Sequence, residues 1–553
     1  MEGRSAERPR SAVAWLLEAP AAAWALAAVA LAFGVVTGLG DRYLHDEGLL
    51  TWHFAQITQE VPAAAFFWQK SRPLLAALYA PFAGLGQPAF TVLHAAVAAL
   101  ALPLLAGAAR GIGQRSPNLP ALLVASSALW LCCGPAGVSN SDALTGLCLA
   151  LYLWLARGRP IAAGLLLGAL LFARSEAAVF VGGIGLYAWL RGPRRLALAI
   201  PAIPGLYALA GALYHHDLLW FLHFPPALPA PPPETPHFGA AGYGAGLGDT
   251  LDAFVALTPA LPLLLAARPR RMPAIERLVG ALAIAYLLAI RGLPAIGLFN
   301  FDSSPRYLLL VLPFAALVIG PVIDGWRDGR QGDRATTLAL VVALGLGLLS
   351  DRLGGSPLPL AAAAGLAGVV ALARAGLPRI AALLLALAAA AALPTIEPVT
   401  RMTFAARYQG LDDAVAWLAA RPELAARPVV TNLSVFGALL DHRGAGGERP
   451  IYYLLGVDQD HEIRTLTNPA VGQDAAIWGA LDRGFYGRPI RPPMTPADPP
   501  PRPRSFVIDD DDRLEQRLPA ASWEGRLREL ARHGRARILI DEGPPPGAST
   551  APR

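Results

Sequence analysis

Lysine, cysteine and charge are all scarce in this sequence. The 553 residues include 46 basic ones, of which Lys70 is the only lysine. Charged residues make up 16% of the chain and hydrophobic residues 54%, whereas roughly 25% charge is usual in soluble domains. This excludes an ordinary soluble protein and indicates a membrane protein. The preference for arginine over lysine, with abundant alanine, glycine and proline, is typical of a high-GC bacterial genome.

Other absences exclude further classes. Cys132, Cys133 and Cys148 lie in apolar runs without a CxxC pair, so we expect small buried residues and no disulfide framework. The arginines stand in short clusters between apolar runs, which does not indicate a nucleic-acid partner. A Gly-rich phosphate loop ending in Lys-Ser/Thr is missing, which counts against an ATP-driven pump. A convincing internal repeat is missing too, which weakens the case for a transporter built from inverted halves.

Apolar runs long enough to form membrane helices dominate the first 394 residues. Their lengths predict an α-helical polytopic membrane domain with about 13 transmembrane helices. The runs are 13–38, 88–109, 119–135, 143–156, 160–173, 177–190, 196–214, 252–267, 278–298, 307–325, 335–350, 356–373 and 380–394. The first run is too long for a signal peptide and lacks a convincing cleavage site, so we interpret it as a retained anchor.

The basic residues predict the orientation of these spans. Arginine clusters such as 191–195, 268–277 and 327–334 fall in alternate loops, and the loops between them hold few basic residues. The positive-inside rule therefore predicts a cytoplasmic N-terminus in a bacterial inner membrane. An odd number of spans then places the C-terminal part in the periplasm.

The composition changes near residue 395. Charges become frequent and the pattern alternates between helix, as in "LDDAVAWLAARPEL", and strand, as in "RPVVTNL" and "RARILID". This pattern predicts two domains, a membrane domain over 1–394 and a small periplasmic α/β domain over 395–553 with a Pro-rich loop.

Charged and polar residues gather on the predicted outer side. Charges at a membrane boundary are costly against lipid, so they usually face a cavity or a partner. The outer side is predicted to hold Asp46, Glu47, Lys70, Arg72, Asp142, Arg174, Glu176 and Arg306. Carboxylates and cations together are expected for an acid/base site beside an anion-binding site.

Five segments, in this order, resemble the GT-C superfamily of glycosyltransferases that use polyprenyl-phosphate sugars. The nearest branch is the protein mannosyltransferase and aminoarabinose transferase type. The segments are the Asp46-Glu47 pair, "WQKSRPLLAALYAPF", "SNSDALTGLCLALYLWLA", "GLLLGALLFARSEAAVF" and "SPRYLLLVLPFAALV". The resemblance covers residues 13–325. The second segment departs from the family's Lys-Pro-Pro-Leu, and the Trp-Trp-Asp motif of oligosaccharyltransferases is absent.

The resemblance implies an inverting transfer of a sugar from a polyprenyl-phosphate carrier to a lipid, glycan or protein acceptor. It implies Asp46 as the general base, with Glu47 as the alternative. Lys70, Arg72, Arg306 and Arg174 are the candidates for binding the carrier phosphate. Asp142, Glu176, Tyr307 and Trp68 are the candidates for orienting the acceptor or the sugar.

Each assignment has a plainer alternative, which for Asp46 and Glu47 is a solvated acidic loop. For Lys70, Arg72 and Arg306 the alternative role is that of an interface anchor. For Arg174 and Glu176 the alternative is a structural ion pair. Asp142 is also placed to cap the span that begins at Ala143. The aromatic residues around Trp68 also suit an interfacial belt.

Two acidic or histidine clusters suggest metal ligands only weakly. His215 to Asp217 lacks a second cluster at ligand spacing, and Asp509 to Asp512 is expected to be solvated. No cofactor is implied with certainty, and a divalent cation stays open. The main rival function is a transporter or flippase for a lipid-linked saccharide, and a third is an oligosaccharide ligase.

Overall fold

The computed structural model describes part of the chain. The described residues are 12–39, 48, 51–52, 55, 58–59, 62, 72–220, 263–264, 267, 270, 272–295, 305–327, 410–424, 427–431, 451–453, 505–509, 527–534 and 536–541. They belong to two compact units. The first draws on residues 1–44, 91–207 and 229–399, and the second on residues 45–90, 208–228 and 400–553.

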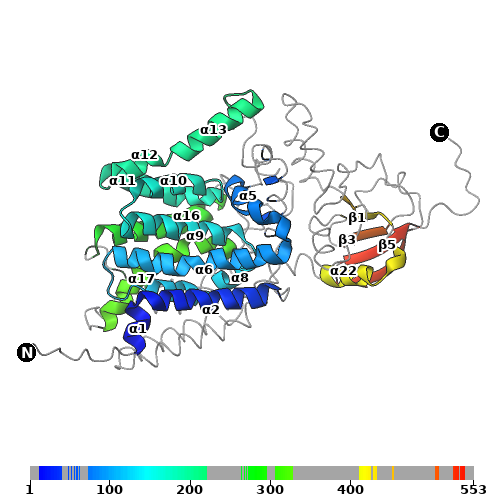
Figure 1. The fold of residues 1–553 in the computed structure, drawn as a ribbon, viewed down its shortest axis with the longest axis horizontal. Coiled ribbons are helices and arrows are strands. Elements are labelled where there is room, and N and C mark those ends of the chain that lie inside the picture. The colour runs from blue at the N-terminus through cyan, green and yellow to red at the C-terminus, as the bar shows by residue number, and fades with distance from the viewer. Residues whose placement is uncertain are drawn as a thin grey trace, which may run out of the picture. The chain divides into compact units, whose positions relative to one another are not determined.

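Helices make up most of the first unit, where they form a bundle (Figure 1). Among the described residues up to 327, the α-helices of both units are α1 (Ala12–Glu18), α2 (Pro20–Leu39), α5 (Pro73–Tyr79), α6 (Gln87–Gly111), α7 (Leu119–Ala125), α8 (Ala128–Cys133), α9 (Ser139–Leu151), α10 (Pro160–Leu170), α11 (Ala178–Leu190), α12 (Arg194–Ala199), α13 (Ala202–His215), α16 (Ala274–Ala295) and α17 (Leu312–Arg327), of which α5 belongs to the second unit. Short 3-10 helices cover Ala80–Leu85, Ser175–Ala177 and Pro305–Val311, and a π-helical turn covers Tyr152–Ala156.

Small residues let two of these helices approach closely. Gly164 and Gly168 lie one turn apart on α10, and a Cβ at either position would overlap the backbone carbonyl of Leu196 or Ile200. Close backbone contact through small residues is a usual way to pack helices in lipid, where the hydrophobic effect does not drive association. The glycines of the "GLLLGALL" segment therefore serve the packing of α10 against α12.

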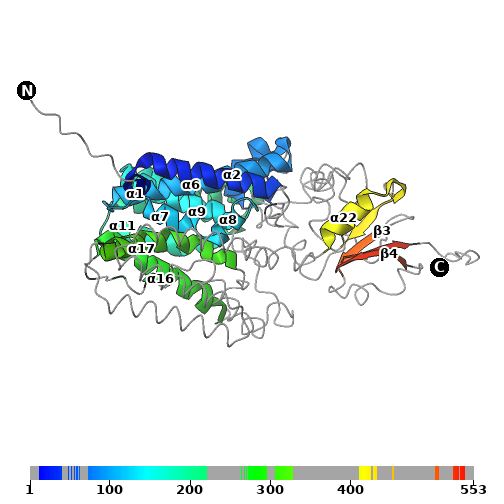
Figure 2. The same ribbon diagram turned by 90° about the horizontal axis from the view of Figure 1, so that it is seen from below.

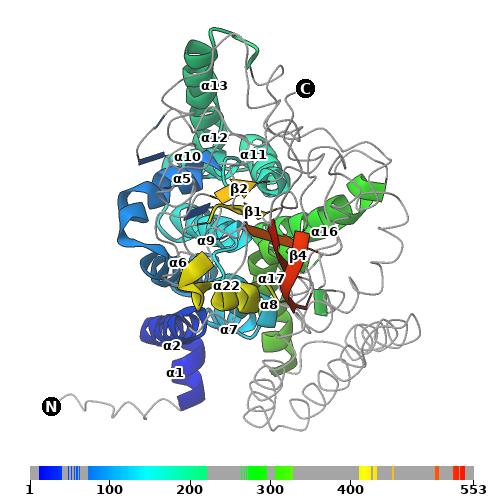
Figure 3. The same ribbon diagram turned by 90° about the vertical axis from the view of Figure 1, so that its right-hand side faces the viewer.

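Helix α9 lies in the interior of the bundle. Nearly every residue of α9 is buried, and the view along the helices shows α9 among its neighbours α6, α10 and α17 (Figure 3). On the other side of the bundle, Phe180 of α11 stacks on Tyr286 of α16 and Phe314 of α17, with ring centroids 4.8 and 4.2 Å away. These rings join α11, α16 and α17 into one packed core.

The predicted spans agree with the helices in most of the described bundle. Four helices are long and apolar enough to cross a membrane, judged by length and composition among the described residues, namely Pro20–Leu39, Pro88–Gly111, Arg194–Tyr214 and Arg306–Gly325. The chain is a multi-pass membrane protein. The predicted runs 335–350, 356–373 and 380–394 lie outside the described residues, so the count of thirteen stays a prediction.

The predicted span 119–135 is wrong in its detail. The run 119–135 forms two short helices, α7 and α8, instead of one continuous span. The break falls at Ser126 and Ser127, and the Ser127 hydroxyl caps α8 by accepting a hydrogen bond from the Trp130 amide at 3.4 Å. An N-terminal serine cap begins a new helix, which is why an apolar run of sufficient length does not continue.

Polar contacts at one end of the bundle come from loops that the arginine pattern places inside the cell. Arg110 donates to the Asn118 side chain at 2.5 Å, and Asn118 in turn donates to the Leu16 and Ala19 carbonyls at 2.8 and 2.7 Å. Ser116 donates to Asp324 at 2.7 Å. These contacts join the 110–118 loop to α1 and α17, as expected if the three segments share one membrane face (Figure 2).

The orientation itself is testable with reporter fusions. A fusion after Ala392 is expected to report from the periplasm and one at Gly332 from the cytoplasm, because the arginine clusters place these positions on opposite sides. Paired alkaline phosphatase and green fluorescent protein fusions measure both compartments. Reports from one compartment for both positions would mean that the span count between them is wrong.

The second unit contains a mixed sheet. Its strands are β1 (Val429–Thr431), β2 (Ile451–Tyr453), β3 (Ser505–Asp509), β4 (Leu527–His533) and β5 (Ala536–Asp541), in the order β2-β1-β3-β5-β4. β1 pairs in parallel with β2 and β3, and β5 pairs antiparallel with β3 and β4. Helix α22 (Leu411–Ala419) packs on β4 and β5 and buries Ala414, Val415 and Leu418.

The sequence pattern anticipates part of this unit. "LDDAVAWLA" forms α22, "VVT" forms β1 and "ARILID" forms β5. The apolar residues Ile538, Leu539 and Ile540 of β5 are all buried, as expected for a strand inside the sheet. The boundary at residue 395 and the extent of a separate periplasmic domain stay predictions, as do the roles of the Pro-rich segment and of Asp510 to Asp512, which lie outside the described residues.

Candidate functional site

A buried ion pair lies where α10 turns into α11. Arg174 is extended in the connection after α10, and Glu176 lies in the 3-10 turn Ser175–Ala177 that leads into α11. Arg174 Nε donates to both carboxylate oxygens of Glu176, at 2.9 and 3.1 Å, and Nη2 makes a further contact to Oε1. The two residues are only 7% and 6% exposed. The paired charges therefore compensate each other inside the protein.

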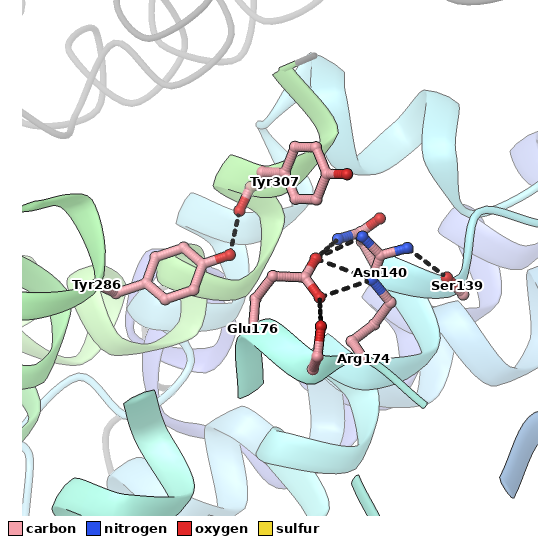
Figure 4. Close-up of polar contacts among 7 residues, drawn as sticks. Ser139, Asn140, Arg174, Glu176, Tyr286 and Tyr307 are labelled. Carbon is pink, nitrogen blue, oxygen red and sulfur yellow. Dashed lines mark hydrogen bonds and ion pairs between the residues drawn. The ribbon is translucent and has the colours of Figure 1, made fainter. Parts of the chain in front are cut away.

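The first turn of α9 braces this pair from a neighbouring helix. Arg174 Nη1 donates to the Ser139 hydroxyl at 3.2 Å, and the Asn140 amide donates to Glu176 Oε1 at 3.3 Å. Figure 4 shows both side chains pointing from α9 towards the pair. Buried ion pairs need such additional hydrogen bonds to offset the loss of water.

Aromatic and cationic groups from the segment before α17 close the site. The Tyr307 ring lies 5.2 Å from the guanidinium carbon of Arg174 and 5.5 Å from that of Arg306. Tyr286 of α16 donates its hydroxyl to the Tyr307 backbone carbonyl at 2.7 Å and so fixes the backbone of this segment (Figure 4). A guanidinium within about 6 Å of a tyrosine ring is attracted by the ring face.

A second buried contact begins on the same turn of α9. Asp142 Oδ2 lies 2.9 Å from Nε2 of His94 on α6, with side chains that are 3% and 0% exposed. His94 Nδ1 lies 3.2 Å from the backbone oxygen of Gly134. The residue before α9, Val138, occupies the capping position. Asp142 therefore lies inside the helix and pairs with His94, and the capping alternative is wrong.

Four of the predicted site residues lie together in the structure, namely Arg174, Glu176, Arg306 and Tyr307. Asp142 lies in the first turn of α9, the turn that hydrogen-bonds to Arg174 and Glu176. Arg72 belongs to the second unit, where it precedes α5 with a positive φ of 48°. Its backbone oxygen accepts hydrogen bonds from the Leu75 and Ala76 amides at 2.8 and 3.0 Å. Asp46, Glu47, Lys70 and Trp68 lie outside the described residues.

Four residues of the site are absent from the sequence-based candidates, namely His94, Ser139, Asn140 and Tyr286. Ser139 and Asn140 carried a signal, because they stand with Asp142 in the polar run "SNSD" before an apolar run. His94 carried a weaker one, as a histidine within the apolar run 88–109. Tyr286 carried none, because an isolated tyrosine in a membrane helix is common.

The metal alternatives gain no support in the described part of the chain. No group of three His, Cys, Asp or Glu residues there is arranged to hold a metal ion. Asp217 instead accepts a hydrogen bond from the Leu219 amide at 2.9 Å. The three cysteines are free and buried, as predicted.

Two solved structures share this multi-pass helical fold. No family model matches the chain, and no curated protein sequence matches it. The matching structures are both ArnT from Cupriavidus metallidurans. One is in the apo state, with a TM-score of 0.55, 16% identity, and coverage of 94% of this chain and 98% of that chain. The other is bound to undecaprenyl phosphate, with a TM-score of 0.53, 15% identity, and coverage of 96% and 98%. At this identity the likeness shows the fold.

Proposed function

We propose that this protein is a membrane glycosyltransferase of the GT-C kind, which moves a sugar from a polyprenyl-phosphate carrier to a lipid, glycan or protein acceptor on the periplasmic side. The fold likeness to ArnT, over 94% of this chain, carries the proposal, together with the undecaprenyl phosphate named in one of those structures. The ordered sequence motifs support the same assignment independently of the fold.

The proposed reaction is an inverting displacement. The acceptor hydroxyl oxygen attacks the anomeric carbon, the bond from that carbon to the phosphate oxygen breaks, and the polyprenyl phosphate leaves. The acceptor proton passes to a carboxylate on the opposite face. We assign this base to Asp46, with Glu47 as the alternative, and the leaving phosphate to fixed cations.

The described cations differ in what they can offer a phosphate. Arg174 is bound to Glu176 and Ser139, so we assign it to holding the site in shape. Arg306 lies against the Tyr307 ring at 5.5 Å and is half-buried. We keep it as the phosphate candidate of the two, because the ring holds a planar guanidinium that suits a phosphate.

The experiment that tests the function uses the full-length protein purified and reconstituted in lipid. Radiolabelled polyprenyl-phosphate sugars are supplied together with an extract of periplasmic-side lipids and glycans as acceptors. Transfer predicts that the label leaves the carrier and appears in an acceptor, while free polyprenyl phosphate accumulates in equal amount. Label that crosses the vesicle membrane while still attached to the carrier would instead identify a flippase.

Lys70 gives a prediction about the donor. The Lys70→Ala variant is expected to bind the lipid-phosphate donor much more weakly, because it lacks the compact ammonium that approaches a phosphate closely. Lys70→Arg is expected to restore binding only in part, since a planar guanidinium meets the phosphate with a different geometry. Donor titrations of both variants measure this, with the turnover at saturating donor less affected.

An unchanged donor dependence in Lys70→Ala would make Lys70 an interface anchor. The phosphate site would then be sought at Arg72 or Arg306, and Arg306→Ala is the variant to compare. Arg194, which lies 5.7 Å from the Trp189 ring at the predicted cytoplasmic end of α12, provides the matched control as Arg194→Ala, with donor use expected to be unchanged.

A further inference from the structure

His94 is buried on α6 between two oxygen atoms. Its Nδ1 lies 3.2 Å from the Gly134 carbonyl oxygen, and its Nε2 lies 2.9 Å from Asp142 Oδ2. The residue has no exposed surface. Both ring nitrogens therefore have an oxygen partner within hydrogen-bonding distance inside the protein.

The two partners fix the number of protons. A backbone carbonyl only accepts hydrogen bonds, so Nδ1 carries a hydrogen. In a neutral ring Nε2 would then present a lone pair to a carboxylate oxygen at 2.9 Å, which is repulsive. A second proton at this contact, either on the ring or on the carboxyl group, removes the repulsion. In both cases the pair is neutral as a whole, which makes its burial far cheaper than that of a lone carboxylate.

The pair is connected to the candidate site through one turn of helix. Asp142 lies three residues after Ser139 and two after Asn140, whose side chains hydrogen-bond to Arg174 and Glu176. All five residues belong to the first unit, and Ser139, Asn140 and Asp142 begin the same helix, α9. An anchor at Asp142 therefore sets where Ser139 and Asn140 meet the ion pair.

We propose that His94 and Asp142 share a buried proton and that His94 is thereby a positioning residue for the Arg174–Glu176 site. This inference rests on the proposed function only for its effect on sugar transfer. Among the described residues, the elements next to His94 also carry the thiols of Cys132 and Cys133 on α8 and of Cys148 on α9, and α2 contributes no titratable group over Pro20–Leu39.

Nitrogen NMR of the protein labelled with ¹⁵N-histidine, in lipid nanodiscs, tests the shared proton without requiring turnover. The signal that disappears in His94→Gln is that of His94. We expect it to show hydrogens on both ring nitrogens at pH 7.5, or a hydrogen on Nδ1 together with a protonated Asp142 in a ¹³C-carboxyl spectrum. A hydrogen on Nε2 alone would overturn the shared proton.

Asp142→Asn is the informative partner variant. Its amide can donate to Nε2 while Nδ1 still donates to Gly134, so the contact survives with one proton fewer. The His94 signal is then expected to show a hydrogen on Nδ1 alone. A doubly protonated His94 in Asp142→Asn would mean that the second proton does not depend on Asp142, which contradicts the pair.

A double-mutant cycle tests the positioning role, also without turnover. His94→Gln keeps a donor near Asp142, whereas His94→Leu removes it. The unfolding temperature of His94→Leu combined with Glu176→Gln is expected to differ from the sum of the single shifts, because both changes act on the first turn of α9. Thr145→Val, which removes a 3.2 Å bond from α9 to Val97 of α6 one turn further along, is the control and is expected to add.

Turnover gives the second arm of this test. His94→Leu is expected to lower transfer at saturating donor by about 10- to 100-fold, since small misplacements at a site have effects of that order, and His94→Gln is expected to recover most of it. Additive unfolding shifts, or equal losses in both histidine variants, would overturn the positioning role. A protein that transfers no sugar in any form would refute the proposed function and leave the NMR result standing.

Discussion

The Asp46→Asn variant is expected to bind the lipid-phosphate donor like the parent protein and to transfer sugar about 10²- to 10⁴-fold more slowly. This is the usual effect of removing a general base. An asparagine keeps the size of the side chain but cannot take the proton of the acceptor hydroxyl, so the loss belongs to turnover and leaves binding in place. Single-turnover transfer from prebound, radiolabelled donor measures the step directly.

Glu47→Gln is the matched control, because it changes the neighbouring carboxylate in the same way. Slow transfer in Asp46→Asn with nearly normal transfer in Glu47→Gln assigns the base to Asp46. The reverse result assigns it to Glu47. Near-normal turnover in both variants would remove the pair from the mechanism and return them to the alternative of a solvated loop.

Hydropathy predicted most of the described helices and was less accurate where polar residues begin or break an apolar run. The run 88–109 became α6 (Gln87–Gly111), and the run beginning at residue 160 became α10, with Pro160 in the first turn as its fixed φ favours. Helix α9 begins at Ser139, four residues before the predicted start. The residues "SNSD" lowered the local hydropathy, yet they are buried and contact polar groups inside the bundle.

The site was predictable where its partners are close in the sequence. Arg174 and Glu176 are two residues apart, so a structural pair was an obvious alternative, and the ion pair is present. His94 and Asp142 belong to different helices, and the sequence around either residue does not indicate that the other is its partner. Ser127 was not predictable either, because the sequence does not show that its hydroxyl caps α8 and so divides the apolar run.

Breaking the Arg174–Glu176 pair is expected to have the largest effect on stability. Glu176→Ala leaves the Arg174 guanidinium buried without its carboxylate, and removing one partner of a buried pair typically costs about 3–5 kcal/mol. That is a large fraction of the stability of most proteins. Glu176→Gln should cost less, because its amide oxygen still accepts a hydrogen bond. Unfolding followed by tryptophan fluorescence in lipid nanodiscs measures both variants.

The double variant Arg174→Met/Glu176→Leu separates structure from catalysis at this site. Replacing both members of a buried ion pair with apolar residues of similar volume is often neutral or stabilising. Its unfolding temperature is therefore expected to return close to that of the parent protein, well above that of Glu176→Ala. If Arg174 acts only by holding the site in shape, donor binding should return with stability, since Arg306 and Tyr307 remain. Recovered stability with donor binding still lost would contradict our assignment, because it would show that the Arg174 guanidinium contacts the carrier phosphate and that Glu176 serves to aim it.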